Sequence, residues 1–199
     1  MEIVDVVQGS VEWFDLRKRR MTASHASAIA ACGKGLETYI NDKMEAIYMT
    51  EEVAGYKNAA MERGNELEPS AALLYSFEVD EPVETVGFVI HSDHVGCSPD
   101  RLVGDDGLVE IKCPENKKFF KMMQGEKVDT GYVWQMQCQM LICEREWCDF
   151  FAYNPNPKSG DLFIVQRFHA DEKAFAKLEK GFEIGLEIMQ SIEKQLGKL

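Results

Sequence analysis

The stretch CSPDRLVGDDGLVEIKCP, residues 97–114, restricts the fold of this chain more than any other segment. It places the apolar, β-branched run LVEIKCP directly after the tight polar turn DDG, which is the pattern of a β-hairpin. Glu110 and Lys112 interrupt this run. Because side chains alternate across a strand, these two share one face, while apolar neighbours such as Ile111 share the other, predicted core face.

Asp100 follows Pro99 just before this hairpin, and the short turn can fold its side chain back beside Glu110. Two carboxylates this close repel each other and raise a pKa unless a cation joins them, and hard cations such as Mg²⁺ bind oxygen ligands of this kind. Lys112 cannot bind such an ion, but its ammonium can orient a water or stabilise charge that develops on a phosphate. The alternative is a solvent-facing Glu-Lys pair with a surface Asp nearby, and the spacing alone leaves both interpretations open.

The remaining patterns predict a single α/β domain over residues 1–199, without a linker or an internal repeat. Residues 83–114 alternate in a way that predicts an antiparallel meander of three strands. Two further strands are expected over 147–154 and 161–169. Helices are expected over 12–20, 36–50, 58–77, 116–124 and 131–144, and from Asp171 onward.

Two local signals refine the helices. Thr22 and Ser24 precede an alanine-rich run and are expected to give a further helix a hydroxyl N-cap, with free N–H groups that suit an anion. Pro69 is expected to kink or break the helix over 58–77 near Glu68, because its ring removes a backbone donor and clashes with the preceding turn.

The six cysteines indicate reduced, buried thiols, because the chain is neither small nor evidently secreted. The competing hypothesis is an iron–sulfur cluster, which would use Cys32, Cys138, Cys143 and Cys148. No pair of these forms a C-x-x-C clamp, and Cys138 and Cys143 would lie about 140° apart around a helix.

The net charge of −12 argues against broad contact with a polyanion. Residues 41–85 alone carry eleven acids against three basic residues, whereas residues 1–40 are neutral and contain the run RKRR at 17–20. Any nucleic-acid contact must therefore be local and strongly salt-dependent. No apolar run approaches the roughly 20 residues of a membrane helix, and the N-terminus lacks the order of a signal peptide, so a cytoplasmic protein with no membrane partner is expected.

The pattern SPD (98–100), nine residues, EIKCP (110–114) resembles the PD-(D/E)xK nuclease signature, and in particular the YqaJ and phage lambda exonuclease family. Three further blocks are similar to this family in the same order: WFDLRKRRMTASHAS (13–27), ERGNELEPSA (62–71) and GYVWQMQCQM (131–140). The resemblance implies an α/β (α+β) fold with a restriction-endonuclease-like core, in which helices flank a central mixed β-sheet.

The same resemblance assigns roles to single residues. It implies that the catalytic residues are Glu68, Asp100, Glu110, Lys112 and Gln135. Of these, the three acids and the backbone carbonyl of Ile111 would bind Mg²⁺, with two ions per site and Mn²⁺ able to substitute. Lys112 would lie beside the attacking water, and Gln135 would contact the site or the DNA backbone. Gln137 is the weaker candidate, and Tyr132 is interpreted as a packing residue.

For DNA, the resemblance places Arg17, Ser24 and Ser98 at the 5′-terminal phosphate, which agrees with the affinity of an arginine fork and of hydroxyls for a dianion. Met61 matches the position of an apolar wedge that separates the terminal base pair. Lys18 and its basic neighbours would be general backbone contacts.

Together these matches imply a Mg²⁺-dependent 5′-to-3′ exonuclease of double-stranded DNA. It would degrade the 5′-phosphorylated strand to mononucleotides and leave 3′ overhangs for phage-type homologous recombination. A homotrimeric ring and a single-strand annealing protein are the implied partners. The alternatives are an endonuclease or repair nuclease of the same superfamily, a DNA-end-binding module without catalysis, and a metalloprotein unrelated to DNA.

Overall fold

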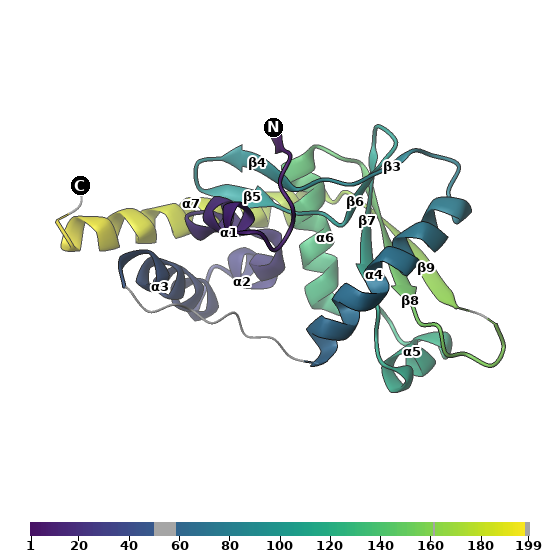
Figure 1. Cartoon of the computed structure of the whole chain (residues 1–199). Helices are drawn as coiled ribbons and strands as arrows, with labels where there is room; N and C mark the ends of the chain where they lie inside the picture. The colour runs from purple at the N-terminus through teal and green to yellow at the C-terminus, as the bar shows by residue number, and fades with distance from the viewer. Residues whose placement is uncertain (50–58, 161, 198–199) are drawn as a thin grey trace.

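The computed structural model describes residues 1–49, 59–160 and 162–197 (Figure 1). The predicted mixture of helices and strands is confirmed, with every expected helix present. A short 3₁₀ turn at Ala23–His25 precedes α2. The helices are α1 (Val11–Lys18), α2 (Ala26–Ala31), α3 (Lys34–Tyr48), α4 (Ala59–Glu78), α5 (Asn116–Met123), α6 (Thr130–Cys143) and α7 (Glu172–Gln195).

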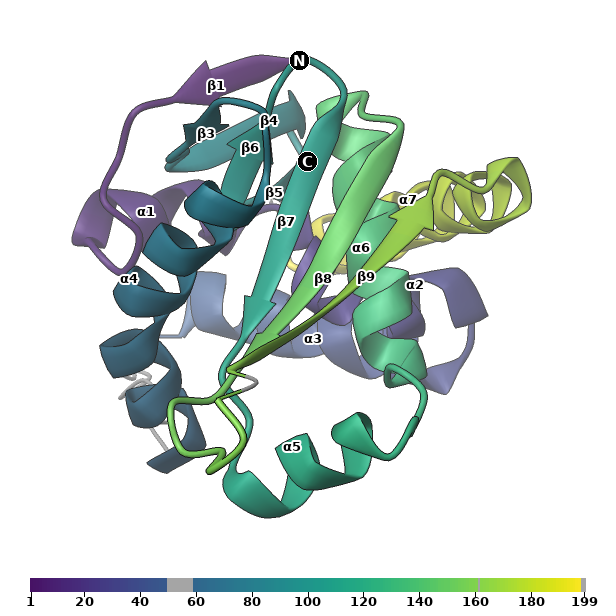
Figure 2. The ribbon, with the colours of Figure 1, turned by 90° about the vertical axis from the view of Figure 1, so that its right-hand side faces the viewer.

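The strands form two mixed sheets, of which the five-stranded one is the expected central sheet flanked by helices (Figure 2). The four-stranded sheet has the order β1 (Glu2–Val4), β4 (Phe88–Ser92), β5 (Val95–Cys97), β2 (Met21–Thr22). The five-stranded sheet has the order β3 (Val83–Glu84), β6 (Arg101–Val103), β7 (Gly107–Lys112), β8 (Trp147–Tyr153), β9 (Phe163–His169). β7 and β8 are its parallel pair, and the other neighbours are antiparallel.

The predicted three-stranded meander is wrong, because its middle strand divides between the two sheets. β5 pairs with β4 in one sheet, and β6 pairs with β7 in the other. The division falls at residues 98–100, where Pro99 has no N–H to offer to a ladder. The strand therefore leaves one sheet and enters the other within three residues, and Asp100 lies at the start of the second.

Helices cover both faces of the five-stranded sheet (Figure 2). α4 lies on one face, where Val109 and Ile111 of β7 belong to a cluster of buried apolar residues with α4 side chains. α6 lies on the other face and also contacts β4 and β5 of the second sheet. The larger core, on the α6 side, includes side chains from α2, α3 and α7. β7 is thus enclosed from both sides, and Glu110 is not on a solvent-facing surface.

Two predictions about helix ends and breaks are not confirmed. α4 runs through Pro69 without a break, and Pro69 is exposed on the outer side of the helix, where water can bond the carbonyl that the ring leaves without a partner. The hydroxyls of Thr22 and Ser24 lie 3.2 Å from each other, and neither caps the 3₁₀ turn or α2. The alanine-rich helix therefore has no hydroxyl N-cap.

All six cysteines are free thiols. Cys97, Cys138, Cys143 and Cys148 are buried, and burial raises the pKa of Cys138, which disfavours the thiolate that a metal needs. Within residues 1–49, 59–160 and 162–197, no three His, Cys, Asp or Glu side chains are arranged to hold a metal, so the iron–sulfur hypothesis is wrong for this arrangement. None of the described helices is long and apolar enough to cross a membrane.

The contact between α7 and α2 depends on Gly181, where a Cβ would lie 2.1 Å from the carbonyl oxygen of Ile29. Gly181→Ala should lower the free energy of unfolding by about 1–3 kcal/mol, because the clash involves backbone that cannot move aside. Gly64→Ala in α4 is the matched control, because no described atom lies within 4 Å of its Cβ. It should raise the free energy of unfolding by about 0.5–1 kcal/mol. Urea denaturation measures both, and equal effects would show that α7 and α2 are not in close contact.

Candidate active site

Three helices, α4, α5 and α6, approach the carboxyl end of β7 (Figure 2). A cleft of about 430 Å³ lies there. Its lining combines two acids and two lysines with apolar side chains. The lining residues are Gly64, Asn65, Glu68, Asp100, Ile111, Lys112, Cys113, Pro114, Lys118, Met122, Tyr132 and Phe150. The cleft therefore collects residues from three of the four sequence blocks, and the block 13–27 contributes none of its lining.

Asp100 reaches the cleft because of the sheet division at Pro99. It precedes β6, whose first residue, Arg101, pairs with Val109 of β7. Its Oδ2 accepts a hydrogen bond of 2.6 Å from the backbone N–H of Ile111, two residues further along β7. The carboxylate is thus fixed across the hairpin, as predicted from the short turn.

Glu110 is a fully buried acid, with 0% of its surface exposed. Its Oε1 accepts a hydrogen bond from Gln135 at 2.7 Å and another from Lys112, and its Oε2 accepts one from Gln139 at 2.8 Å. Burial of an ionised acid is costly unless its oxygens are paired, and these donors supply the pairing. Glu110 and Lys112 share one face as predicted, but the solvent-facing alternative is wrong.

The charges in the cleft influence one another. The pKa of Asp100 is raised above its ordinary value, first by burial and then by repulsion from Glu110. Burial by itself lowers the pKa of Lys112, but attraction to Glu110 and Asp100 outweighs that effect and raises the pKa. Lys112 is therefore an ammonium at neutral pH, and it lies 5.1 Å from the centre of the Tyr132 ring.

Glu68 enters the cleft from α4, with 37% of its side chain exposed. Its Oε1 forms an ion pair of 3.1 Å with the guanidinium of Arg101, which also donates to the backbone carbonyl of Asp100. Arg101 therefore connects the acid of α4 to the residue at the sheet division.

The donor set suits a hard divalent cation. Three carboxylates are present, and repulsion between two of them, Asp100 and Glu110, is what a cation relieves. In the described arrangement, however, protein donors hold each acid: Arg101 holds Glu68, Ile111 holds Asp100, and Lys112 with two glutamines holds Glu110. Consequently no described group of three acids, histidines or cysteines is arranged around a common point. The three carboxylates suit Mg²⁺. A bound ion would take the place of the hydrogen-bond donors that hold these carboxylates in the described arrangement.

A second polar cluster lies where α1 meets the start of the sheet division. The Nε1 of Trp13 donates to Oγ of Ser98 at 2.7 Å, and the guanidinium of Arg17 lies over the Trp13 ring, 4.2 Å from its centre. Burial lowers the pKa of Arg17. Arg17 and Ser98, two of the three predicted phosphate ligands, are therefore brought together by one indole ring.

Ser24, the third predicted phosphate ligand, belongs to an adjoining network. Its Oγ lies 3.2 Å from Oγ1 of Thr22 and 3.2 Å from Nδ1 of His25. The His25 ring stacks on Tyr39 at 4.0 Å between centres, and the Tyr39 hydroxyl accepts from the backbone N–H of Thr22. The structure places Met61 in the first turn of α4, but its side chain lies outside the described residues.

The contacts of α6 show which of its glutamines reach Glu110. Gln135 contacts Glu110 as expected, whereas Gln137 points away, donates to the His169 carbonyl at 2.8 Å and accepts from the Asp171 N–H at 3.0 Å. Gln139, which is 1% exposed, was missed. The available signal was its position four residues after Gln135, which places both on one side of the helix.

Three aromatic or basic residues beside the site have roles that the sequence did not show in full. Tyr132 packs 5.7 Å from Phe150 as expected, but it also faces Lys112 in the cleft, so packing is only part of its role. Arg101 and Trp13 were missed as partners of site residues, because nothing local in the sequence indicates which distant side chain they meet.

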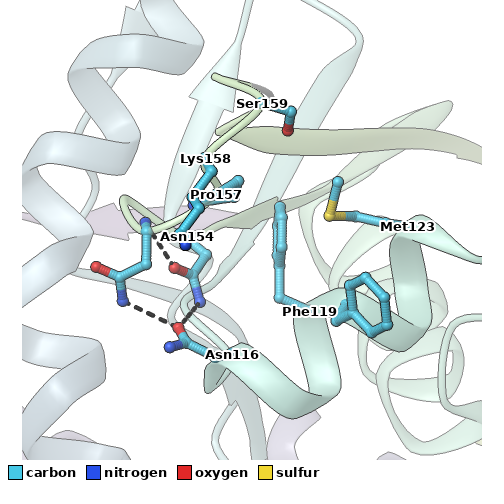
Figure 3. A pocket seen from close by; sticks show the side chains of 9 residues that line it. Asn116, Phe119, Met123, Asn154, Pro157, Lys158 and Ser159 are labelled. Atoms are coloured by element: carbon cyan, nitrogen blue, oxygen red, sulfur yellow. Dashed lines mark hydrogen bonds between the residues drawn. The ribbon is translucent and has the colours of Figure 1, made fainter.

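A separate cavity of about 350 Å³ lies on the other side of α5, toward the turn between β8 and β9 (Figure 3). Its walls carry an amide network in which Asn154 and Asn156 both donate to Oδ1 of Asn116, at 3.1 and 2.9 Å. Phe119 and Met123 supply the apolar wall. Its described lining contains no acid, so it offers neither a metal site nor a general base.

Comparison with known proteins agrees with the geometry. The model of the YqaJ-like viral recombinase domain matches residues 12–146. None of the curated proteins is significantly similar to the chain. The crystal structure of an alkaline exonuclease (LHK-Exo) from Laribacter hongkongensis superposes with a TM-score of 0.85 at 32% identity, over 95% of this chain and 97% of that one.

Two further structures extend the comparison. LHK-Exo in complex with dAMP gives a TM-score of 0.81 at 32% identity, over 95% of this chain and 99% of that one. A phage related exonuclease from Haemophilus somnus 129PT gives 0.71 at 12% identity, over 89% and 96% of the two chains, which shows a shared fold alone. The fold is of the PD-(D/E)xK type, as predicted. Because the matched segment covers well over half of the 199 residues, the chain belongs to the YqaJ-like viral recombinase domain family.

Proposed function

We propose that this protein is a Mg²⁺-dependent exonuclease that degrades the 5′-phosphorylated strand of duplex DNA from 5′ to 3′. The products would be mononucleotides and 3′ single-stranded overhangs for phage-type recombination. The observation that carries the proposal is the residue pair Ser98 and Asp100. They lie two positions apart. Ser98 accepts a hydrogen bond from Trp13, whose ring carries Arg17, and Asp100 lines the acidic cleft. A cluster suited to a terminal phosphate therefore adjoins a cleft suited to hydrolysis.

Each residue of the cleft has a distinct task in this proposal. Glu68, Asp100, Glu110 and the Ile111 carbonyl hold Mg²⁺, with two ions per site and Mn²⁺ able to substitute. The bound ions supply Lewis-acid polarisation of the phosphodiester and a water of lowered pKa. Lys112, an ammonium at neutral pH, orients the attacking water and stabilises the negative charge that develops on the phosphate.

The two glutamines of α6 act through Glu110. Gln135 and Gln139 donate to opposite oxygens of its carboxylate and fix its plane. Donors of this kind tune ligand orientation and basicity around a metal site. Water attacks phosphorus in line, the bond to the 3′ oxygen breaks, and a 5′ mononucleotide leaves.

Polarity follows from the cluster around Trp13. Arg17, Ser24 and Ser98 hold the 5′-terminal phosphate, and Met61 separates the terminal base pair. LHK-Exo, at 32% identity, is an alkaline exonuclease with a structure in complex with dAMP, which supports a nucleotide-binding cleft in this chain also. Residues 1–199 act as one nuclease domain.

The assembly in this proposal is a homotrimeric ring that encircles DNA. A ring confines duplex contact to an inner surface, which reconciles a net charge of −12 with a polyanionic substrate. A single-strand annealing protein is the proposed partner that takes up the exposed 3′ strand.

The first test is digestion of linear duplex DNA with and without 5′ phosphates, beside a closed circle, in Mg²⁺. Only the 5′-phosphorylated linear form should shorten quickly, and chelation of Mg²⁺ should abolish the reaction. Lys112→Ala should be inactive, because it removes the charge beside the water. Cleavage of the circle would favour an endonuclease or repair nuclease, and binding of ends without cleavage in any metal would favour a non-catalytic module.

The second test separates two glutamines of one helix. Gln139→Met should lower kcat by about 10- to 100-fold, because Glu110 loses the donor to its Oε2 while the side-chain volume is kept. Gln137→Met is the control, since among the described residues this side chain bonds only to the backbone near the start of α7. It should lower the melting temperature and leave kcat within about twofold. Equal kcat values for the two variants would refute the role of Gln139.

A further inference from the structure

Two cationic residues, Arg17 and Lys43, meet where α1 ends against α3. Lys43 of α3 donates from Nζ to the Arg17 carbonyl at 2.8 Å and to the Lys18 carbonyl at 3.4 Å. The guanidinium of Arg17 lies on the Trp13 ring and acts on Lys43 through its charge. Both cations are half-buried.

No carboxylate in the described part of the chain forms an ion pair with either cation. Asp42 is exposed, and its charge is felt at His25 without pairing with Lys43. His25 adds no third positive charge, because burial and the two cations lower its pKa and favour its neutral form. Two half-buried positive charges therefore have no counter-ion among the described residues.

This arrangement has an electrostatic consequence. Burial, and then the charge of Arg17, lowers the pKa of Lys43 to about 8. A bound anion raises the pKa of Lys43 again, because it supplies the missing opposite charge. A terminal phosphate monoester, which carries close to two negative charges at neutral pH, matches two cations better than a diester does.

The donors of Lys43 fit the same role. An ammonium has three N–H donors, and two of them are directed at the carbonyls that end α1. The ammonium also lies 5.4 Å from the centre of the Tyr39 ring. No acceptor among the described residues takes its third N–H, which is therefore available to a ligand. Because the carbonyl bonds fix the ammonium, little side-chain entropy is lost when an anion binds.

We propose that Lys43 is a direct ligand of the 5′-terminal phosphate and, with Arg17, sets the preference for phosphorylated over unphosphorylated ends. The inference rests on the proposed exonuclease function and extends it, since the family resemblance assigned only Arg17, Ser24 and Ser98 to this phosphate. The competing role for Lys43 is structural: a cation bonded to the last carbonyls of α1 stabilises that helix end.

Equilibrium binding separates the two roles without relying on catalysis. Fluorescent duplexes with a 5′ phosphate or a 5′ hydroxyl are titrated into Lys112→Ala protein, in which the site cannot turn over. Lys43→Gln should lower the ratio of the two affinities by about 10- to 100-fold, because a charge-assisted hydrogen bond to the phosphate is lost. Lys43→Arg should restore most of the ratio.

Lys18→Gln is the matched control, because Lys18 is an exposed lysine of α1 with no described ion pair. It should weaken both duplexes alike and leave the ratio unchanged. If Lys43→Gln is too unstable to assay, ¹³C-methylated lysines of the otherwise unmodified protein provide the second measurement. The Lys43 resonance should shift on addition of the 5′-phosphorylated duplex and not with the 5′-hydroxyl duplex.

The outcomes distinguish this inference from the proposed function. If the parent protein prefers 5′-phosphorylated ends and Lys43→Gln keeps that preference with a lower melting temperature, Lys43 only supports α1 and the inference is wrong. If the parent protein binds both ends equally, recognition of the terminal phosphate fails as a whole, and the inference fails with it.

Discussion

The hydrogen bond from the Ile111 N–H to the Asp100 carboxylate is the contact on which the rest of the site depends. It forms only because the chain leaves one sheet at Cys97 and enters the other at Arg101. The same three-residue crossing places Ser98 beside Trp13 and Asp100 beside β7. End recognition and hydrolysis, as proposed, are thus joined by a rigid segment that contains a proline, so that a bound 5′ end has a fixed relation to the cleft.

Burial of Glu110 is the second constraint. A carboxylate with no solvent contact is stable only if the fold supplies donors for its oxygens, and three side chains do so here. Two of these donors come from α6, which also contacts the strands of the four-stranded sheet. Packing of α6 between the sheets therefore decides the geometry of the acid, and substitutions far from the cleft that move α6 should be felt at Glu110.

Much of this was accessible from the sequence, and the failures have physical causes. The helix and strand positions follow from periodicity, and the shared face of Glu110 and Lys112 follows from strand alternation. The meander was wrong because an unbroken β pattern does not show which partner each half will pair with. The solvent-facing alternative for Glu110 could not be excluded, because the helix that covers it begins twenty residues later. Gln139 was missed even though its spacing from Gln135 placed both on one helix face.

The sequence by itself determined the family, the PD-(D/E)xK type of fold and the candidate residues, because motifs and periodicities are properties of neighbouring positions. Tertiary structure alone decided the division of a strand between two sheets and the ion pair of Arg101 with Glu68. It also decided the hydrogen bond from Lys43 to the Arg17 carbonyl at the end of α1. The contacts of Arg101 and Lys43 join residues 33 and 26 positions apart. Such contacts form only when helices and sheets pack against each other, and the residues next to Arg101 or Lys43 in the sequence do not show which distant segment will pack there.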